Sequence, residues 1–385
     1  MKRKITILTI AFLSSVLMCA NAFAAATGRC GDSITWTLDD SGNLTLSGSG
    51  EMWNNGYDDS PFKDYEIRKA TVKYGITSIG ESAFLGCRGM TELTLPNSVT
   101  SIGGNAFEGC RGLTELILPN SVTSIGNAAF VDCSGLTELI LPSSVTSIGD
   151  FAFYGCSGLT ELTLPNSVTS IGDGAFRGCS GLTELTLPNS VTSIGDGAFR
   201  GCSGLTELTL PNSVTSIGDC AFYGCTGLTE LILPNSVSSI GDIAFTYCSG
   251  LEKITVESGN SRYDSRDNCN SIIDKKTNTL IAGCKNSIIP NSITSIGNSA
   301  FYYCSELTEL TLLDSVTSIG RSAFEGCTGL VKITSLAKIP PVCDSEVFDG
   351  VNKTNCELIV PEGSVAAYMR AEVWNEFSNI RAFPE

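Results

Sequence analysis

A unit of 23 residues recurs along most of the chain and constrains its fold more than any other feature. Residues 159–181 read LTELTLPNSVTSIGDGAFRGCSG, and residues 182–204 repeat them without a change. Such a period predicts a solenoid, in which each turn of the chain stacks on its neighbours. Positions within the unit are numbered 1–23 below. Copies open at Ile67, Met90, Leu113, Leu136, Leu159, Leu182, Leu205, Leu228, Leu251, Cys284, Leu307 and, in degenerate form, Leu330.

The order of residues within the unit predicts short strands and turns with little α-helix. Leucines at positions 1, 4 and 6 predict a strand that ends before the proline at position 7. The Asn-Ser pair at positions 8 and 9 is typical of a turn, and the β-branched residues at positions 10–13 predict a second short strand. We expect the glycine at position 14 to adopt a backbone conformation that other residues resist.

Equivalent residues of successive repeats are expected to stack about 4.8 Å apart. We expect the phenylalanines at position 18 to form one continuous aromatic spine. These are Phe84, Phe107, Phe130, Phe153, Phe176, Phe199, Phe222, Phe245, Phe301 and Phe324.

The cysteines at position 21 are expected to form a second buried ladder and to stay reduced. Parallel Cβ vectors do not give a disulfide its dihedral angle, and a buried cysteine behaves as a small apolar residue. Outside the ladder, Cys269 with Cys284 and Cys343 with Cys356 are the pairs to test for disulfides. The ladder comprises Cys87, Cys110, Cys133, Cys156, Cys179, Cys202, Cys225, Cys248, Cys304 and Cys327.

Residues 1–24 have the pattern of an export signal. Basic residues at 2–4 precede an apolar run, and Ala22-Phe23-Ala24 is typical of a cleavage site. Cys19 is a poor lipidation site because Met18 precedes it. The apolar run is short for a membrane span, and no second run follows. We therefore expect a secreted or cell-surface protein without membrane insertion.

The remaining sequence divides into a capped array. Residues 25–66 predict an N-terminal β-hairpin cap, residues 67–329 the solenoid, and residues 330–385 a C-terminal cap. In the C-terminal cap, apolar residues from Val365 to Phe377 recur at helical spacing, and Ser364 is placed to cap that helix.

The register breaks once, in a 33-residue unit at 251–283. Its pieces Ser271–Ile273 and Leu280–Ala282 predict a hairpin. This insertion is either an irregular turn of the solenoid or a loop with a function of its own.

Composition excludes several classes of function. The net charge is −16, and it becomes −19 without residues 1–24, which carry three basic residues and no acid. That sign opposes binding to nucleic acid or to anionic membrane. Histidine is absent, so the chain lacks the commonest general base and metal ligand. Every exposed feature recurs many times, whereas catalysis needs a unique constellation. We therefore expect neither an enzyme nor a cofactor, a metal site or catalytic residues.

Glutamates at position 3 form the candidate binding face. If the first strand points them to solvent, they stack one above another, and like charges opposite one another on a sheet are destabilising. Three interpretations remain open: a solvated polar face, a surface for a basic protein, or a row of carboxylates bridged by calcium. At position 5, isoleucines replace threonine in three repeats and add apolar patches. The candidate residues are Glu92, Glu115, Glu138, Glu161, Glu184, Glu207, Glu230 and Glu309 with Ile117, Ile140 and Ile232.

The unit LxxLxLPxSVxxIGxxAFxGC resembles the leucine-rich repeats of the BspA-like surface proteins, also called the Treponema pallidum type. The resemblance covers about residues 67–329, and the segments around Trp36 and Val360–Trp374 are similar to the flanking regions of that family. One departure is serine at position 9, where ordinary leucine-rich repeats carry an asparagine ladder. The turn there must therefore be satisfied differently.

The resemblance implies a β-rich leucine-rich repeat solenoid and an exported, adhesin-like protein. Members of the family are associated with binding host extracellular matrix proteins and with aggregation between bacteria. The expected partner is therefore a matrix protein or a bacterial surface protein, bound through the repeated face. The alternative is a structural spacer at the cell surface without a ligand of its own.

Overall fold

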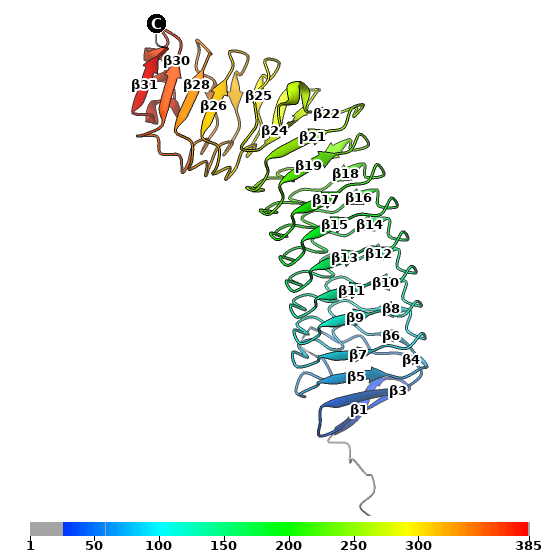
Figure 1. Ribbon diagram of the computed structural model, residues 1–385. Coiled ribbons are helices and arrows are strands. Elements are labelled where there is room, and N and C mark those ends of the chain that lie inside the picture. Colours follow the sequence, from blue (N-terminus) through cyan, green and yellow to red (C-terminus); the bar gives the residue numbers. More distant parts are fainter. Residues whose placement is uncertain (1–25, 58, 384–385) are drawn as a thin grey trace, which may run out of the picture.

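The computed structural model describes residues 26–57 and 59–383 and is a curved β-solenoid (Figure 1). Each 23-residue repeat makes one turn with three sides. Positions 3–5 form a strand, positions 12 and 13 form a two-residue strand, and positions 15–20 form a series of turns. We call these sides the acidic face, the second sheet and the turn face. The predicted solenoid with little helix is confirmed.

Strands of the acidic face pair in parallel within four sheets. Identical positions lie opposite one another, as in Glu138 with Glu161 and Leu139 with Leu162. The strands are β5 (Lys69–Val72), β7 (Glu92–Thr94), β9 (Glu115–Ile117), β11 (Glu138–Ile140), β13 (Glu161–Thr163), β15 (Glu184–Thr186), β17 (Glu207–Thr209), β19 (Glu230–Leu233), β21 (Lys253–Val256), β26 (Glu309–Leu312), β28 (Lys332–Ser335), β30 (Glu357–Val360) and β31 (Asn379–Ala382). The four sheets join β5 with β7, β9 to β17, β19 with β21, and β26 to β31.

The second sheet is built from Ser-Ile pairs, whose isoleucines face the core. In the first part of the chain its strands are β4 (Gly50–Glu51), β6 (Ile76–Ile79), β8 (Ser101–Ile102), β10 (Ser124–Ile125), β12 (Ser147–Ile148), β14 (Ser170–Ile171), β16 (Ser193–Ile194), β18 (Ser216–Ile217) and β20 (Ser239–Ile240). After the insertion it continues with β25 (Ser295–Ile296), β27 (Ser318–Ile319) and β29 (Val342–Cys343).

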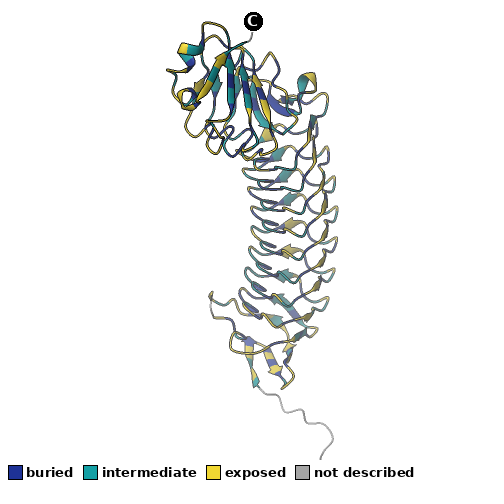
Figure 2. Cartoon of the chain, turned by 60° about the vertical axis from the view of Figure 1, so that its left-hand side comes forward, coloured by how far each residue is buried: buried dark blue, intermediate teal, exposed yellow. Residues whose placement is uncertain are grey.

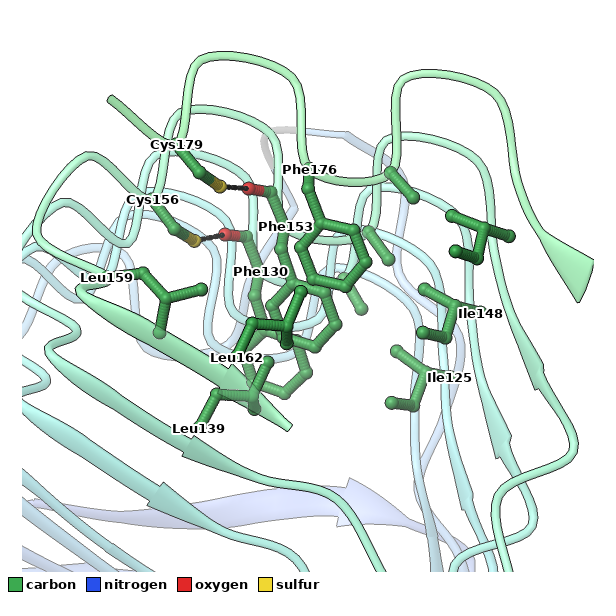
Figure 3. Packing of buried hydrophobic residues seen from close by; sticks show 14 of the residues in the cluster. Ile125, Phe130, Leu139, Ile148, Phe153, Cys156, Leu159, Leu162, Phe176 and Cys179 are labelled. Atoms are coloured by element: carbon green, nitrogen blue, oxygen red, sulfur yellow. Dashed lines mark hydrogen bonds between the residues drawn. The ribbon is translucent and has the colours of Figure 1, made fainter. Parts of the chain in front are cut away.

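Phenylalanine rings at position 18 stack through the core, where Figure 3 shows three of them in line. From Phe84 to Phe245 the ring centroids lie 5.0–5.5 Å apart. Among the described residues, however, no ring contact joins Phe245 to Phe301. The expected single spine is therefore wrong, because the core consists of two clusters. The inserted hairpin separates the two clusters, because its Ile272 belongs to the first cluster and its Ile273 to the second.

The insertion replaces one turn of the solenoid, and the stack bends there (Figures 1 and 2). Its hairpin is formed by β23 (Ser271–Asp274) and β24 (Thr279–Gly283), which confirms the predicted hairpin. The short strand β22 (Tyr263–Asp264) and a 3-10 turn at Arg266–Asn268 precede it. The buried Asn260 amide donates to the carbonyls of Pro234 and Val237 and so fixes the insertion to the preceding turn.

Both ends of the array are capped by aromatic residues. At the N-terminus, β2 (Ile34–Leu38) and β3 (Asn43–Gly48) form the predicted hairpin, and β1 (Ala26–Gly31) adds a strand that we did not predict. Trp36 packs on Phe62, whose ring centroid lies 5.0 Å from that of Phe84. The N-terminal segment thus extends the spine by two rings.

The C-terminal helix is much shorter than its spacing predicts. Helix α1 spans only Val365–Tyr368, and a separate 3-10 turn spans Trp374–Glu376. Val373 has a φ of 70° and separates them, so that Tyr368 and Trp374 both turn inward. The Trp374 indole donates to the Pro341 carbonyl, and its ring packs on Phe348. Ser364 makes no side-chain cap, contrary to our expectation.

Glycine at position 14 is required for space and not for its conformation, which corrects our expectation. A Cβ on Gly126 would lie 2.7 Å from the backbone of Gly103 in the preceding turn, and no position-14 glycine has a positive φ. Positive φ values occur instead at positions 16 and 20. Non-glycine residues at position 16, such as Ala128, therefore carry a conformational cost of roughly 1–2 kcal/mol.

We expect Phe176→Ala to lower the free energy of unfolding by about 3–5 kcal/mol, because it leaves a cavity within the first cluster. The matched control is Phe151→Ala, since Phe151 is 41% exposed. Urea denaturation followed by circular dichroism measures both. Equal losses in the two variants would contradict the buried spine.

The two identical repeats provide a test of the turn face. Gly174 and Gly197 have φ values of 58° and 59°, but a Cβ on Gly174 would lie 2.4 Å from the Phe151 ring, whereas Gly197 has nothing nearer than 3.8 Å. We expect Gly174→Ala to be less stable than Gly197→Ala by about 1 kcal/mol, since Phe151 must leave its rotamer. Adding Phe151→Ala should remove the difference in the urea midpoint. A difference that persists would place its cause elsewhere.

Candidate functional site

The position-3 glutamates lie on exposed strands, but the structure divides them into two groups. The first group runs up the continuous stack from Glu92 to Glu230. Glu309 lies beyond the insertion, in a sheet formed by β26, β28, β30 and β31. The candidate residues therefore form one long row and one separate residue.

Lysines close the long row at both ends. The ammonium of Lys69 lies 2.5 Å from a Glu92 carboxylate oxygen, and that of Lys253 lies 2.6 Å from Glu230. In the second group, Glu309 pairs with Lys332 at 3.3 Å. Each of these lysines occupies position 3 of a neighbouring turn, directly opposite its glutamate.

The five glutamates between the ends have no cationic partner among the described residues. Their carboxylates are exposed, and each stands opposite another glutamate or beside one in the next turn. Opposed like charges are destabilising on a sheet, and solvent screens them only in part. These residues are Glu115, Glu138, Glu161, Glu184 and Glu207.

A groove of about 400 Å³ opens in the middle of this row. It lies between β13 and β15, which share a single registered pair, Thr163 with Thr186. Glu161 and Glu184 line its two sides, together with Thr183. The groove therefore presents two carboxylates and hydroxyl groups around one shallow space.

The position-5 isoleucines are exposed as predicted. Ile117, Ile140 and Ile232 are 58%, 47% and 46% exposed. Ile288, which we did not select, is 65% exposed at the same position of the repeat that opens at Cys284. Ile288, Glu309 and Asp267 line a separate groove of about 360 Å³.

A second row of acids, at position 15, was missed by the sequence analysis. The side chains of Asp150, Asp173, Asp196 and Asp219 each accept the backbone N–H of the equivalent residue in the next turn. For Asp150 and Asp173 that distance is 3.0 Å, and for Asp219 and Asp242 it is 2.7 Å. The signal was the Asp or Asn that follows SIG in six consecutive repeats. These carboxylates hold the turns together and, in the described ranges, no group of acids, cysteines or histidines is arranged to hold a metal ion.

Serine at position 9 replaces the asparagine ladder of ordinary leucine-rich repeats. The Ser213 hydroxyl, for example, donates to the Val191 carbonyl of the preceding turn at 2.7 Å. This bond repeats along the stack, so the serine hydroxyl pairs with a backbone carbonyl of each turn in place of an asparagine ladder.

The ladder cysteines are free thiols in the core, as predicted. Eight of the ten thiols donate to the carbonyl of a phenylalanine one turn back. Figure 3 shows Cys156 with Phe130 and Cys179 with Phe153. Burial raises the pKa of Cys133 and Cys202 to about 12. The pairs named for testing are also free thiols in the structure.

Comparison with known proteins agrees with this geometry. A sequence model described as the BspA type leucine rich repeat region matches residues 57–183, 170–273 and 271–358. The chain belongs to the BspA-type leucine-rich repeat family. No curated protein matches its sequence significantly.

Two solved structures of this kind align along nearly the whole chain. A leucine rich cell surface protein from Faecalibacterium prausnitzii is 26% identical, with 95% of this chain and 97% of that chain covered and a TM-score of 0.59. A leucine-rich repeat protein from Bacteroides ovatus is 25% identical, with 92% and 99% covered and a TM-score of 0.58.

None of the helices within residues 26–57 and 59–383 has the length and apolar composition of a membrane span.

The buried thiols predict a loss of stability at alkaline pH. Their folded pKa lies above the unfolded value of 9.0, so the stability they contribute is present below pH 9 and falls as pH rises toward 12. Replacing Cys133 and Cys202 with alanine should flatten this fall by about 1.4 kcal/mol per pH unit for each thiol removed. Urea titrations between pH 8 and 11 measure the slopes. If the unmodified protein and the variant had the same slope, the alkaline loss of stability could not be assigned to these thiols.

Proposed function

We propose that this protein is exported to the cell surface and binds a basic protein partner through the row Glu115–Glu207. The observation that carries the proposal is the absence of cations from the middle of the row. Lysine is compatible with position 3, because Lys69, Lys253 and Lys332 occupy it. Its restriction to the ends leaves five stacked carboxylates uncompensated.

Charge and shape support a partner with lysine or arginine side chains. A row of five strands spaced about 4.8 Å apart places carboxylates along roughly 20 Å. The groove between Glu161 and Glu184 has room for one long cationic side chain. The exposed Ile117, Ile140 and Ile232 add apolar contacts at both ends of the row. Binding would then be the sum of several equivalent contacts, with electrostatics governing the association rate.

The family supports the location and the class of function. The similar protein from Faecalibacterium prausnitzii is described as a leucine rich cell surface protein. Residues 1–24, which lie outside the described residues, have the pattern of an export signal. Matrix proteins and proteins on other bacterial cells are the partners that we propose. Nothing in the repeated face resembles a catalytic constellation, and we propose no enzymatic activity.

The test is binding of the purified protein to immobilised matrix proteins and to bacterial surface proteins over a salt series. We expect the triple variant Glu138→Gln, Glu161→Gln, Glu184→Gln to bind at least tenfold more weakly at low salt. A matched control removes three exposed acids elsewhere, with Asp314→Asn, Glu362→Gln and Glu372→Gln. The difference should shrink at high salt, because added ions screen exposed charges.

Equal weakening in the triple variant and in the control would show that only net charge matters and would overturn the proposed site. Binding to none of these proteins would favour the spacer interpretation.

A further inference from the structure

The turn face carries a regular hydrogen-bond ladder that stops at the insertion. In uninterrupted turns, the backbone N–H groups at positions 16, 18 and 20 donate to carbonyls of the next turn. Phe222, for example, donates to Ala244, and Gly224 donates to Thr246. The turn that follows Tyr247 lacks this half of the repeat. Among the described residues, the N–H groups of Ile243, Phe245 and Tyr247 consequently have no acceptor.

The other side of the interruption has the complementary deficit. The carbonyls of Asn298 and Tyr302 receive no donor from a described residue, and only the Ala300 carbonyl is bonded, by Gly283 of the inserted hairpin. Within the described part of the chain, the turn face before the insertion therefore ends in unpaired backbone N–H groups, and the turn face after the insertion begins with unpaired backbone carbonyls.

Four tyrosines gather at the same place. The ring centroid of Tyr247 lies 5.9 Å from Tyr223 and 5.0 Å from Tyr303, and Tyr302 lies 4.7 Å from Tyr303. Tyr302 lies beyond the interruption, and its ring packs edge-on against Tyr247 with the centroids 6.4 Å apart. Tyr247 and Tyr303 are 36% and 42% exposed, so aromatic surface remains open to solvent.

Beside these rings lies a hollow of about 360 Å³, within the usual range of roughly 300–1,000 Å³ for small-ligand sites. Tyr223, Tyr302 and Ile243 supply its apolar lining. Asn298 and Glu325 supply polar lining. The Asn298 side-chain oxygen accepts the Arg321 backbone N–H at 3.0 Å, which leaves its amide as a donor.

The charges of the hollow disfavour an anionic ligand. Arg321 also lines it, but its guanidinium lies 2.9 Å from Glu346, and Glu325 adds a further negative charge. An anion would face Glu325 without a free cation. A cationic group would pair with Glu325, but it offers no acceptor to the Asn298 amide.

We propose that this hollow binds a neutral saccharide. A sugar hydroxyl both donates and accepts, so one ligand satisfies the Ile243 N–H, the Asn298 amide and the Glu325 carboxylate together. The C–H face of a pyranose ring packs on an aromatic ring, and the half-buried rings of Tyr223 and Tyr302 line the hollow. The site is separate from the acidic face, and it exists because the insertion removes half of one turn.

The test uses the purified protein and a panel of neutral oligosaccharides of glucose, mannose, galactose and N-acetylglucosamine. Saturation-transfer difference NMR detects binding, and titration gives Kd. We expect Tyr302→Ala and Glu325→Gln each to raise Kd at least tenfold. Tyr154→Ala and Glu108→Gln change the same position 19 in uninterrupted turns, and they should leave Kd unchanged.

Glu325→Gln keeps the shape of its side chain, so it remains informative if Tyr302→Ala fails to fold. Circular dichroism checks the fold of each variant. Three results would overturn the proposal: no transfer to any saccharide of the panel, equal losses in the position-19 controls, or binding only of acidic saccharides or basic peptides.

Discussion

The whole molecule depends on the stacking of one side chain on its own copy in the next turn. Phenylalanine rings about 5 Å apart fill the core, and the same repeat distance lets thiols, serine hydroxyls and aspartates bond to backbone groups of the neighbouring turn. Each turn contacts only its neighbours, so stability is close to a sum of equal interfaces. A stack of this kind needs covers for its first and last rings. Trp36 with Phe62, and Trp374 with Phe348, provide them.

The same repetition explains which surfaces are available for binding. Inward positions must be apolar in every turn, whereas outward positions are free to vary. The acidic face nevertheless keeps glutamate at position 3, although opposed carboxylates are unfavourable and lysine is tolerated at its ends. The turn face varies much more, and its most distinctive surface lies where the repeat is interrupted. The regular repeats thus produce one long acidic surface, and the insertion that interrupts them produces one local hollow.

Periodic features could be predicted from the sequence because the same residue type recurs at the same position of each repeat. The strands, the buried phenylalanines and the reduced cysteines followed directly from positions 4, 18 and 21. What a glycine is needed for could not be read in this way: at position 14 it makes room for the preceding turn, while the positive φ lies at positions 16 and 20. The break between Phe245 and Phe301 and the single helical turn at Val365–Tyr368 depend on contacts that are unique in the chain, so no repetition revealed them. The position-15 aspartates were visible in the repeat, but polar residues there were not considered as backbone partners.

The two identical repeats at 159–204 have a consequence for how this protein changes over generations. Since the upper surface of one such turn matches the lower surface of the other, a further copy could be inserted, or one removed, without creating a new interface. Recombination between identical segments would then lengthen or shorten the row of carboxylates by one glutamate at a time. The reach and avidity of the protein could therefore be adjusted in unit steps, while the caps, the bend and the tyrosine hollow stay as they are.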